Sequence, residues 1–309
     1  MSLGPVLLQA AAAAAGAQHF PTAALYVVAT PIGNMADLTL RAIHVLSLVD
    51  AVACEDTRHS ASLLQHLSLH KPLLALHEHN ERGASEAVIQ RLARGERVAY
   101  VSDAGTPAVS DPGAVLVAQV QAAGYRVLPL PGASSAIAAL SVAGSVANQE
   151  DWETAGFSFV GFLSHKAATR STQLQQLAAK PQTQVLFEAP HRIEALCAAL
   201  ATACGARRVT VCRELTKQFE TVVTLAAHDL PQWLAEDAHR ERGEFVLVLH
   251  ALAPAAEHDE ADTEHDAVLR LLLAELPLKQ AVSLATSLTQ APRNRLYARA
   301  LVLKQDQTP

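Results

Sequence analysis

Short apolar runs rich in β-branched residues alternate with helical patterns between residues 24 and 140. In the helical segments, apolar residues recur every three or four positions, and Asp37 is the predicted N-cap of the first segment. Alternation of this kind predicts a mainly parallel sheet covered by helices. The predicted strands are Leu25–Ala29, Ala51–Cys54, Leu73–His77, Val98–Ser102 and Val127–Leu130, with helices over residues 37–49, 60–67 and 84–94.

From about residue 155 the apolar runs become longer, which indicates a second, mixed sheet. The chain therefore predicts two α/β domains, residues 24–148 and 149–252, joined near residues 145–155. The strands of the second domain are predicted at Phe157–Phe162, Thr183–Phe187, Val209–Cys212, Thr221–Leu225 and Phe245–Leu249, and its helices at Lys166–Ala179 and Arg192–Ala203.

Both ends of the chain differ from this α/β pattern. The alanine-rich residues 1–23 lack the basic region of a secretory signal peptide, so we expect a disordered extension there, either frayed or helical. Residues 253–265 are acidic and predict a flexible linker. Three amphipathic helices follow within residues 266–304, a pattern that resembles a helix-turn-helix module. A small dimerising or capping bundle is the alternative interpretation.

Composition and charge limit the classes of partner. Half of the 309 residues are hydrophobic, yet no stretch reaches the roughly 18 apolar residues of a membrane helix, so we expect no membrane span and a cytoplasmic location. With a net charge of −6, nucleic-acid contacts must come from local patches. One such patch is residues 276–304, which contain five basic residues and no acidic one. The four cysteines have no zinc-ligand spacing, and no metal site is predicted.

Loops of small and polar residues follow three of the strands in the first domain. These loops are Thr30–Asn34, Ser102–Pro107 and Pro131–Ser135. Because the carboxyl ends of parallel strands lie at one edge of a sheet, the three loops are expected to form one pocket. The glycine patterns that bind triphosphates or dinucleotides are absent from the sequence. A ligand with a purine, a ribose and an amino-acid end but no phosphate, such as S-adenosylmethionine, fits this pattern.

Seven short motifs in order along the chain resemble the signature of the ribosomal RNA small-subunit methyltransferase I family, within the tetrapyrrole (corrin/porphyrin) methylase superfamily. They are Pro31–Asn34, Cys54–His59, Val101–Pro107, Ser110–Gly113, Pro129–Gly132, Arg213–Lys217 and Gly243–Val246. The resemblance implies a two-domain α/β fold with a helical C-terminal module. It also implies a homodimer that uses S-adenosylmethionine to methylate the ribose 2′-hydroxyl of a decoding-centre cytidine in 16S rRNA of the small ribosomal subunit.

The candidate site residues fall into three groups. For catalysis, we expect Lys217 near the 2′-hydroxyl, with Glu188 or Glu220 setting its proton affinity. The predicted cofactor-binding residues are Pro31, Gly33, Asp103, Ala104, Gly105, Thr106, Ser134 and Ser135, with Phe187 and Leu215 from the second domain. The predicted RNA-binding residues, expected to contact phosphates, are Arg58, Arg192, Arg213, Lys279, Arg293, Arg295 and Arg299.

Two other functions share parts of this pattern. A small-molecule methylase of corrin or sirohaem synthesis would have the same α/β fold, but a tetrapyrrole substrate leaves the basic C-terminal helices without a role. A helix-turn-helix regulator that senses a small ligand would not need the charged cluster at residues 213–220. Both features favour an RNA-modifying enzyme.

Overall fold

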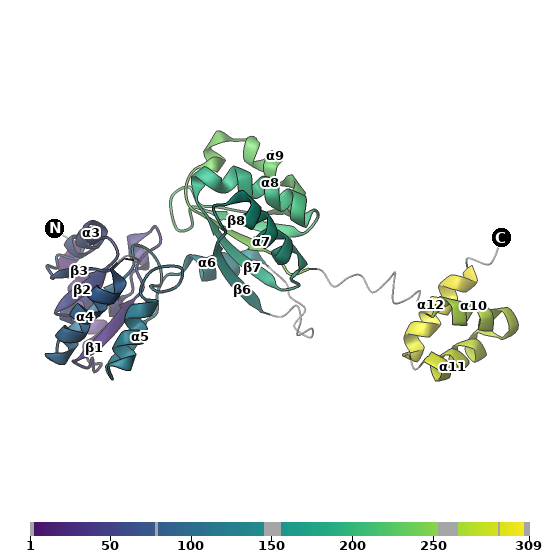
Figure 1. Cartoon of the computed structure of the whole chain (residues 1–309), viewed down its shortest axis with the longest axis horizontal. Helices are drawn as coiled ribbons and strands as arrows, with labels where there is room; N and C mark the ends of the chain where they lie inside the picture. Colours follow the sequence, from purple (N-terminus) through teal and green to yellow (C-terminus); the bar gives the residue numbers. More distant parts are fainter. Residues whose placement is uncertain (1–2, 78–79, 145–155, 253–264, 290, 306–309) are drawn as a thin grey trace. The chain divides into compact units, whose positions relative to one another are not determined.

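The computed structural model describes residues 3–77, 80–144, 156–252, 265–289 and 291–305 (Figure 1). Two compact units make up the chain, Met1–Ala251 and Leu252–Pro309. The domain junction near residues 145–155 and the acidic linker, except for His265, lie outside the described residues.

Five parallel strands form the first sheet, in the order β3-β2-β4-β1-β5. Their bounds are β1 Ala24–Val28, β2 Ala51–Cys54, β3 Leu73–Ala75, β4 Arg97–Val101 and β5 Arg126–Leu130. All five strands were predicted to within two residues at each end. Side chains of β1 alternate between the two faces, so that Leu25 and Tyr26 are both buried but belong to different cores. The sheet is therefore the middle layer of an α/β/α sandwich.

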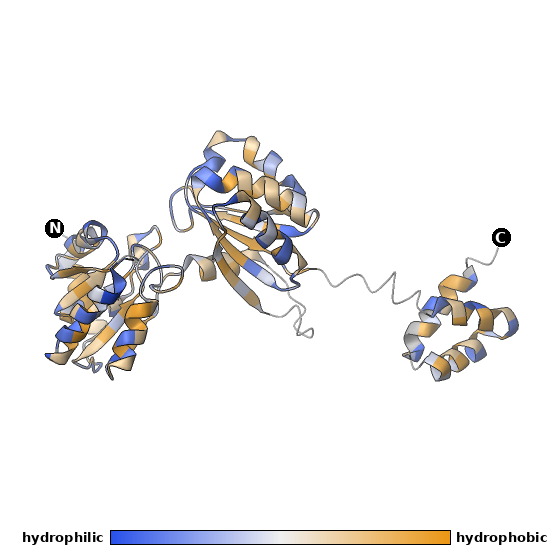
Figure 2. Ribbon diagram, in the orientation of Figure 1, coloured by the Kyte–Doolittle hydropathy of each residue, from blue (hydrophilic) through white to orange (hydrophobic). Residues whose placement is uncertain are grey.

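Helices cover both faces of this sheet. The helices α1 Leu3–Ala15, α2 Leu40–Leu48 and α3 Thr57–His66 pack on one face, and α4 Glu81–Ala93 and α5 Ala114–Ala122 pack on the other. The predicted cap Asp37 is wrong: it ends a short 3₁₀ helix, Met35–Asp37, and the Thr39 hydroxyl instead accepts the hydrogen bond from Ala42 N that caps α2. Figure 2 shows the mixed polar and apolar faces of these helices.

The N-terminal segment differs from the expected disordered extension. Residues 3–15 form α1, which packs against α2 and buries Ala11 completely. Leu7 and Leu8 add contacts to the same core. Alanine has the highest helix propensity and its small side chain allows close helix packing, so a segment that reads as low-complexity becomes a layer of the fold.

The second sheet is mixed, as expected, with the order β6-β7-β10-β8-β9. Only β6 and β7 are parallel, and the other neighbouring pairs are antiparallel. The strands are β6 Phe157–Phe162, β7 Thr183–Glu188, β8 Arg208–Arg213, β9 Thr221–Ala226 and β10 Phe245–Leu249.

Different helices cover the two faces of the second sheet. The helices α7 Ala167–Ala179, α8 Ile193–Cys204 and α9 Leu230–Ala235 cover one face, and α6 Ser135–Ala143 covers the other. Three further 3₁₀ helices are Pro190–Arg192, Ala227–Asp229 and Ala238–Glu241. Although α6 follows β5 of the first sheet in sequence, it packs on the second sheet, and Ile32 from the loop after β1 joins the same core. Loops that follow β1 and β5 of the first sheet thus share one apolar cluster with the second sheet, inside Met1–Ala251.

A buried histidine at the end of β10 makes the stability of this unit depend on pH. Burial, with help from the charges of Arg208 and Arg207, lowers the pKa of His250 to about 4, and its Nε2 lies 2.7 Å from the Thr210 hydroxyl. In the unfolded chain the pKa is about 6.5, so below that pH the unfolded state binds more protons than the folded state. The stabilisation is therefore present above pH 6.5 and is lost as the pH falls toward 4.

We predict that wild-type protein loses about 2 kcal/mol more than His250→Gln when the pH changes from 7 to 5. The glutamine can still bond to Thr210 but takes up no proton. Urea unfolding at both pH values measures the difference. Equal losses for the two proteins would contradict the assignment.

The C-terminal unit is a bundle of three helices, α10 Asp266–Glu275, α11 Leu278–Thr289 and α12 Arg293–Gln305 (Figure 1). Leu269, Val282 and Leu296 form its core. The Asp266 side chain is 8% exposed and binds the Arg299 guanidinium at 2.7 and 2.8 Å. None of the described helices is long and apolar enough to cross a membrane.

Candidate functional site

Three loops at the carboxyl ends of β1, β4 and β5 are hydrogen-bonded to one another. Thr30 and Gly105 exchange both backbone hydrogen bonds, at 2.9 and 3.0 Å. The Thr106 hydroxyl donates to the Ala133 carbonyl at 3.1 Å. Because β1 lies between β4 and β5, the sheet order brings these loops together. They form one edge, where ligands of open α/β sheets bind.

This loop edge and the face of the second sheet enclose a cavity of about 360 Å³, a size common among small-molecule sites. Ile32, Ala104 and Ser135 line it from the first loops and the start of α6, and Phe187 and Leu215 line it from the second sheet and its β8–β9 loop. Its walls are mostly apolar. The remaining lining residues are Asp111, Phe162, Glu188, Ala189, Pro190, Cys212, Glu244, Phe245 and Val246.

The charged side chains that line this cavity are all acidic: Asp111, Glu188 and Glu244. Burial, together with the charge of Asp103, raises the pKa of Asp111, and the same two causes raise the pKa of Glu55 at the end of β2. Glu188 is paired with Arg192 and Glu244 with Lys217, whereas Asp111 has no ion pair within 4.0 Å among the described residues. A carboxylate without a paired cation repels a phosphate and attracts a cation. The cavity therefore suits a positively charged ligand without phosphate groups.

Glu188 has a buried side chain with one unused oxygen. Its Oε1 accepts from Ala189 N at 2.9 Å and lies 3.2 Å from Arg192 Nε, whereas Oε2 has no hydrogen-bond partner in the described part of the chain. The side chain is 0% exposed. A buried carboxylate oxygen without a partner is costly, so a ligand that donates a hydrogen bond would stabilise this arrangement.

Lys217 is held between two carboxylates that the sequence analysis did not select. Its Nζ lies 2.8 Å from Glu214 Oε1 and 2.8 Å from Glu244 Oε2. Burial opposes the ammonium charge, but these hydrogen bonds outweigh it and raise the pKa of Lys217. The expectation that Glu188 or Glu220 sets its proton affinity is wrong, since Glu188 binds Arg192 and the Glu220 carboxylate accepts from Thr216 N at 2.6 Å.

The position of Lys217 depends on a glycine in the opposite loop. A Cβ added to Gly33 would lie 2.5 Å from Lys217 Cγ and 2.9 Å from Cε, so the lysine stem crosses directly over this backbone. Glu214 and Thr216 in the β8–β9 loop both have positive φ angles, of 52° and 67°. Such strained backbone at a cavity wall is typical of functional loops.

The predicted cofactor-binding residues divide into three sets. Ala104, Ser135, Phe187 and Leu215 line the cavity. Pro31 and Asp103 line a smaller cavity of about 230 Å³ next to the same loops. The other four shape the loops: Gly33 lies beneath Lys217, Gly105 and Thr106 make the hydrogen bonds described above, and Ser134 precedes α6 as its N-cap.

The predicted RNA-binding arginines have different environments. Arg58 is 91% exposed on its side chain and paired with Asp56. Arg192 is buried, and its guanidinium donates to the Leu163 carbonyl at 2.8 Å, which makes it a structural residue instead of a phosphate ligand. Arg299 is likewise used inside the helical bundle, by Asp266. Lys279 and Arg293 are exposed.

Several site residues were missed because their position depends on the second sheet. Asp111, Glu244 and Ile32 all belong to motifs of the family resemblance, so the motifs marked them, but no local pattern distinguished them from neighbouring residues. Glu214 belongs to the charged cluster at residues 213–220 but was not chosen as the partner of Lys217, because Glu188 and Glu220 precede or follow predicted strands in the same way. Only the chain path brings Glu214 and Glu244 to one ammonium group.

Gly105 offers a test of the loop edge. Its φ is +80°, where any side chain is strained, and its N–H and carbonyl both bind Thr30. We expect Gly105→Val to weaken cofactor binding about tenfold or more, because strain of this kind costs about 1–2 kcal/mol. Isothermal titration calorimetry measures the affinity for the cofactor. Gly124→Val is the matched control, since Gly124 has φ +82° but follows α5, away from the loop edge. Equal affinities for the two variants would contradict the site.

Comparison with known proteins agrees with this geometry. Residues 24–231 match the family of tetrapyrrole (corrin/porphyrin) methylases, and residues 259–304 match the RsmI C-terminal HTH domain. The chain is 47% identical to a protein of Pseudomonas aeruginosa named ribosomal RNA small subunit methyltransferase I, over 90% of this chain and 96% of that protein. Proteins of the same name from Vibrio cholerae and Escherichia coli O157:H7 are 43% and 42% identical, over 88% and 90% of this chain and 92% and 94% of theirs.

Solved structures support the fold. The cobalamin biosynthetic enzyme cobalt precorrin-4 methyltransferase has a TM-score of 0.55 at 19% identity and covers 75% of this chain and 97% of its own. A diphthine synthase has a TM-score of 0.56 at 16% identity, and the match covers 74% of this chain and 90% of the diphthine synthase. The fold of the first unit and the helical C-terminal unit thus agree with these matches, and the chain is a methyltransferase that belongs to the ribosomal RNA small subunit methyltransferase I family.

Proposed function

We propose that this protein uses S-adenosylmethionine to methylate the ribose 2′-hydroxyl of a decoding-centre cytidine in 16S rRNA. The observation that carries the proposal is the cavity, whose walls are apolar and whose charged lining residues are all carboxylates. S-adenosylmethionine has no phosphate, and its sulfonium, ammonium and carboxylate groups leave it with a net positive charge, which is complementary to that lining. The names of the close relatives supply the RNA substrate class.

The residues present fit this cofactor. Ile32, Leu215 and Val246 provide apolar surface for the adenosine, and the unpartnered Oε2 of Glu188 can accept a hydrogen bond from an amino or ammonium group. When bound, the cofactor supplies an activated methyl group on a sulfonium. The protein must then align the ribose hydroxyl and remove its proton.

Glu244 is suited to accept the proton of the 2′-hydroxyl, and Lys217 is suited to stabilise the oxygen that loses it. The carboxylates of Glu214 and Glu244 keep Lys217 charged, so it acts as a cation that stabilises the developing negative charge on the 2′-oxygen. Glu244 lines the cavity and touches Lys217, and its carboxylate accepts the hydroxyl proton as the new oxygen–carbon bond forms.

The direct test uses small ribosomal subunits and the naked RNA as separate substrates. With protein and cofactor, primer extension at low nucleotide concentration is expected to stop at one decoding-centre cytidine, whereas omission of either component gives no stop. Transfer of the methyl group to a tetrapyrrole instead would support the small-molecule alternative and overturn the proposal. The homodimer implied by the resemblance and the cytoplasmic location expected from the composition stay predictions, and sedimentation tests the homodimer.

A further inference from the structure

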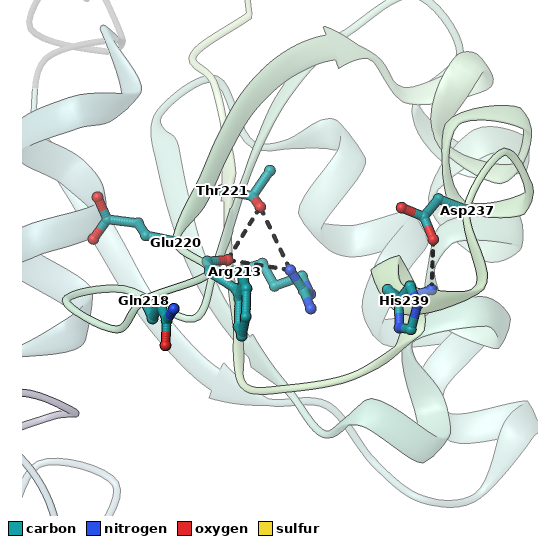
Figure 3. A pocket seen from close by; sticks show the side chains of 7 residues that line it. Arg213, Gln218, Glu220, Thr221, Asp237 and His239 are labelled. Carbon is teal, nitrogen blue, oxygen red and sulfur yellow. Dashed lines mark hydrogen bonds between the residues drawn. The ribbon is translucent and has the colours of Figure 1, made fainter.

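A second, larger cavity of about 620 Å³ lies at one end of strands β8 and β9 of the second sheet (Figure 3). It is lined by the β8–β9 loop, which also carries Lys217, and by the 3₁₀ helix Ala238–Glu241 with the residue before it. The side chains concerned are Arg213, Gln218, Phe219, Glu220, Thr221, Asp237 and His239.

Arg213 presents a cation to this cavity without a carboxylate partner. Its guanidinium donates to the carbonyl of Arg242 at 2.6 Å and to that of Phe219 at 3.2 Å, and it lies 3.5 Å from the Thr221 hydroxyl. In the described residues it makes no ion pair within 4.0 Å. The carbonyls fix the orientation of the guanidinium plane and leave its charge uncompensated by direct contact.

Phe219 supplies the second feature. Phe219 is 69% exposed, which places it among the most exposed large apolar residues that the structure describes. It lies two residues after Lys217 in the same loop. Exposed aromatic rings next to a fixed cation are how proteins hold unstacked bases of single-stranded RNA.

Two carboxylates in the lining indicate which part of a nucleotide this cavity takes. Asp237 accepts from His239 N at 2.8 Å and faces Arg213 across the cavity, whereas Glu220 points away from Arg213 (Figure 3). A phosphate held by Arg213 would be repelled by the Asp237 carboxylate. The edge of a base offers acceptors for a guanidinium and amino donors for a carboxylate at once.

We propose that this cavity is a subsite for an unpaired base next to the methylated nucleotide, stacked on Phe219 and read along its edge by Arg213 and Asp237. The inference rests on the proposed function, since it needs an RNA substrate. It assigns Arg213 to a base, where the sequence analysis expected a phosphate contact.

The test compares Phe219→Ala, Phe219→Trp and the control Phe157→Ala, a change at another half-exposed phenylalanine on the edge strand β6. We expect Phe219→Ala to weaken the affinity for small-subunit RNA, and raise its KM, about tenfold. Phe219→Trp should keep the RNA affinity and the KM near their wild-type values, and Phe157→Ala should change neither quantity. The slope of affinity against salt concentration stays unchanged in Phe219→Ala, because no phosphate contact is lost. Cofactor affinity, measured by calorimetry, is also unchanged.

Arg213→Met separates a base contact from a phosphate contact. Loss of affinity with an unchanged salt slope supports the subsite, whereas a slope that falls by about one charge assigns Arg213 to a phosphate and overturns it. Phe219→Ala with normal RNA affinity would also overturn it, as would a change from dimer to monomer in sedimentation, which would make the surface an interface between copies. If wild-type protein fails to methylate RNA at all, the proposed function fails, independently of these variants.

Discussion

Replacing Lys217 with methionine is expected to lower the kcat of RNA methylation by about 100-fold or more, the range for removing a positioned charge or proton-transfer group. Methionine keeps an unbranched stem of similar length, so the contact with the Gly33 backbone is retained. The ammonium bound by Glu214 and Glu244 is removed. Cofactor affinity should therefore change little, and the loss should appear in single-turnover rates at saturating cofactor and RNA.

Two further variants make this result specific. Lys217→Arg keeps a positive charge and should retain more activity than Lys217→Met. Glu220→Gln changes a carboxylate that binds Thr216 N instead of Lys217, so its effect on kcat should be several-fold at most. A Lys217→Met protein that methylates RNA at the normal rate would remove Lys217 from the mechanism. An equal loss in Glu220→Gln would assign the effect to the shape of the loop.

Truncation of the chain after Leu252 is expected to weaken its affinity for small-subunit RNA by about 100-fold at physiological salt. It removes the compact unit that carries Lys279, Arg293 and Arg295. If these three residues neutralise phosphates, the salt slope should fall by about 2. Cofactor affinity should not change, because the core of Leu269, Val282 and Leu296 belongs to the removed unit alone.

A full-length control distinguishes charge from the rest of the unit. Lys279→Gln, Arg293→Gln and Arg295→Gln combined leave the Asp266–Arg299 pair in place, so the bundle should still fold. This variant is expected to reproduce most of the loss seen after truncation. Truncation with full RNA affinity would support the alternative of a dimerising or capping bundle.

Local patterns predicted the strands well, but not the helices α5, α6 and α9 or the packing partners of each element. The strands of both sheets follow from apolar runs bounded by turn residues, and such runs need no knowledge of the rest of the chain. Two features of the N-terminal half, the cap of α2 and the ordered packing of α1, were not predicted, and both have the same cause. Asp37 was a good cap by type, yet Thr39 lies closer to the first free N–H of α2, and the alanine-rich α1 is ordered by packing on α2 that no local pattern reveals.

Candidate site residues divide along the same line. The loop residues Ala104, Ser135 and Leu215 follow strands and were predicted to meet a ligand, and all three line the cavity. The charged residues were harder, because an arginine or glutamate next to a strand end looks the same whether it is buried in a pair or free. Arg192 and Glu188 form a buried ion pair just after β7, and the sequence alone does not reveal that both side chains are buried.

The amino-acid sequence by itself determined the strands, the order of the loops after them and the absence of phosphate-binding glycine patterns, because these depend on residues close together in the chain. The tertiary structure alone decided which carboxylates hold Lys217, which arginines are buried in internal contacts and which cavity lies beside Phe219. Electrostatic interactions between side chains depend on distance in space and on burial, and residues far apart in the chain, such as Lys217 and Glu244, acquire both only when the chain folds.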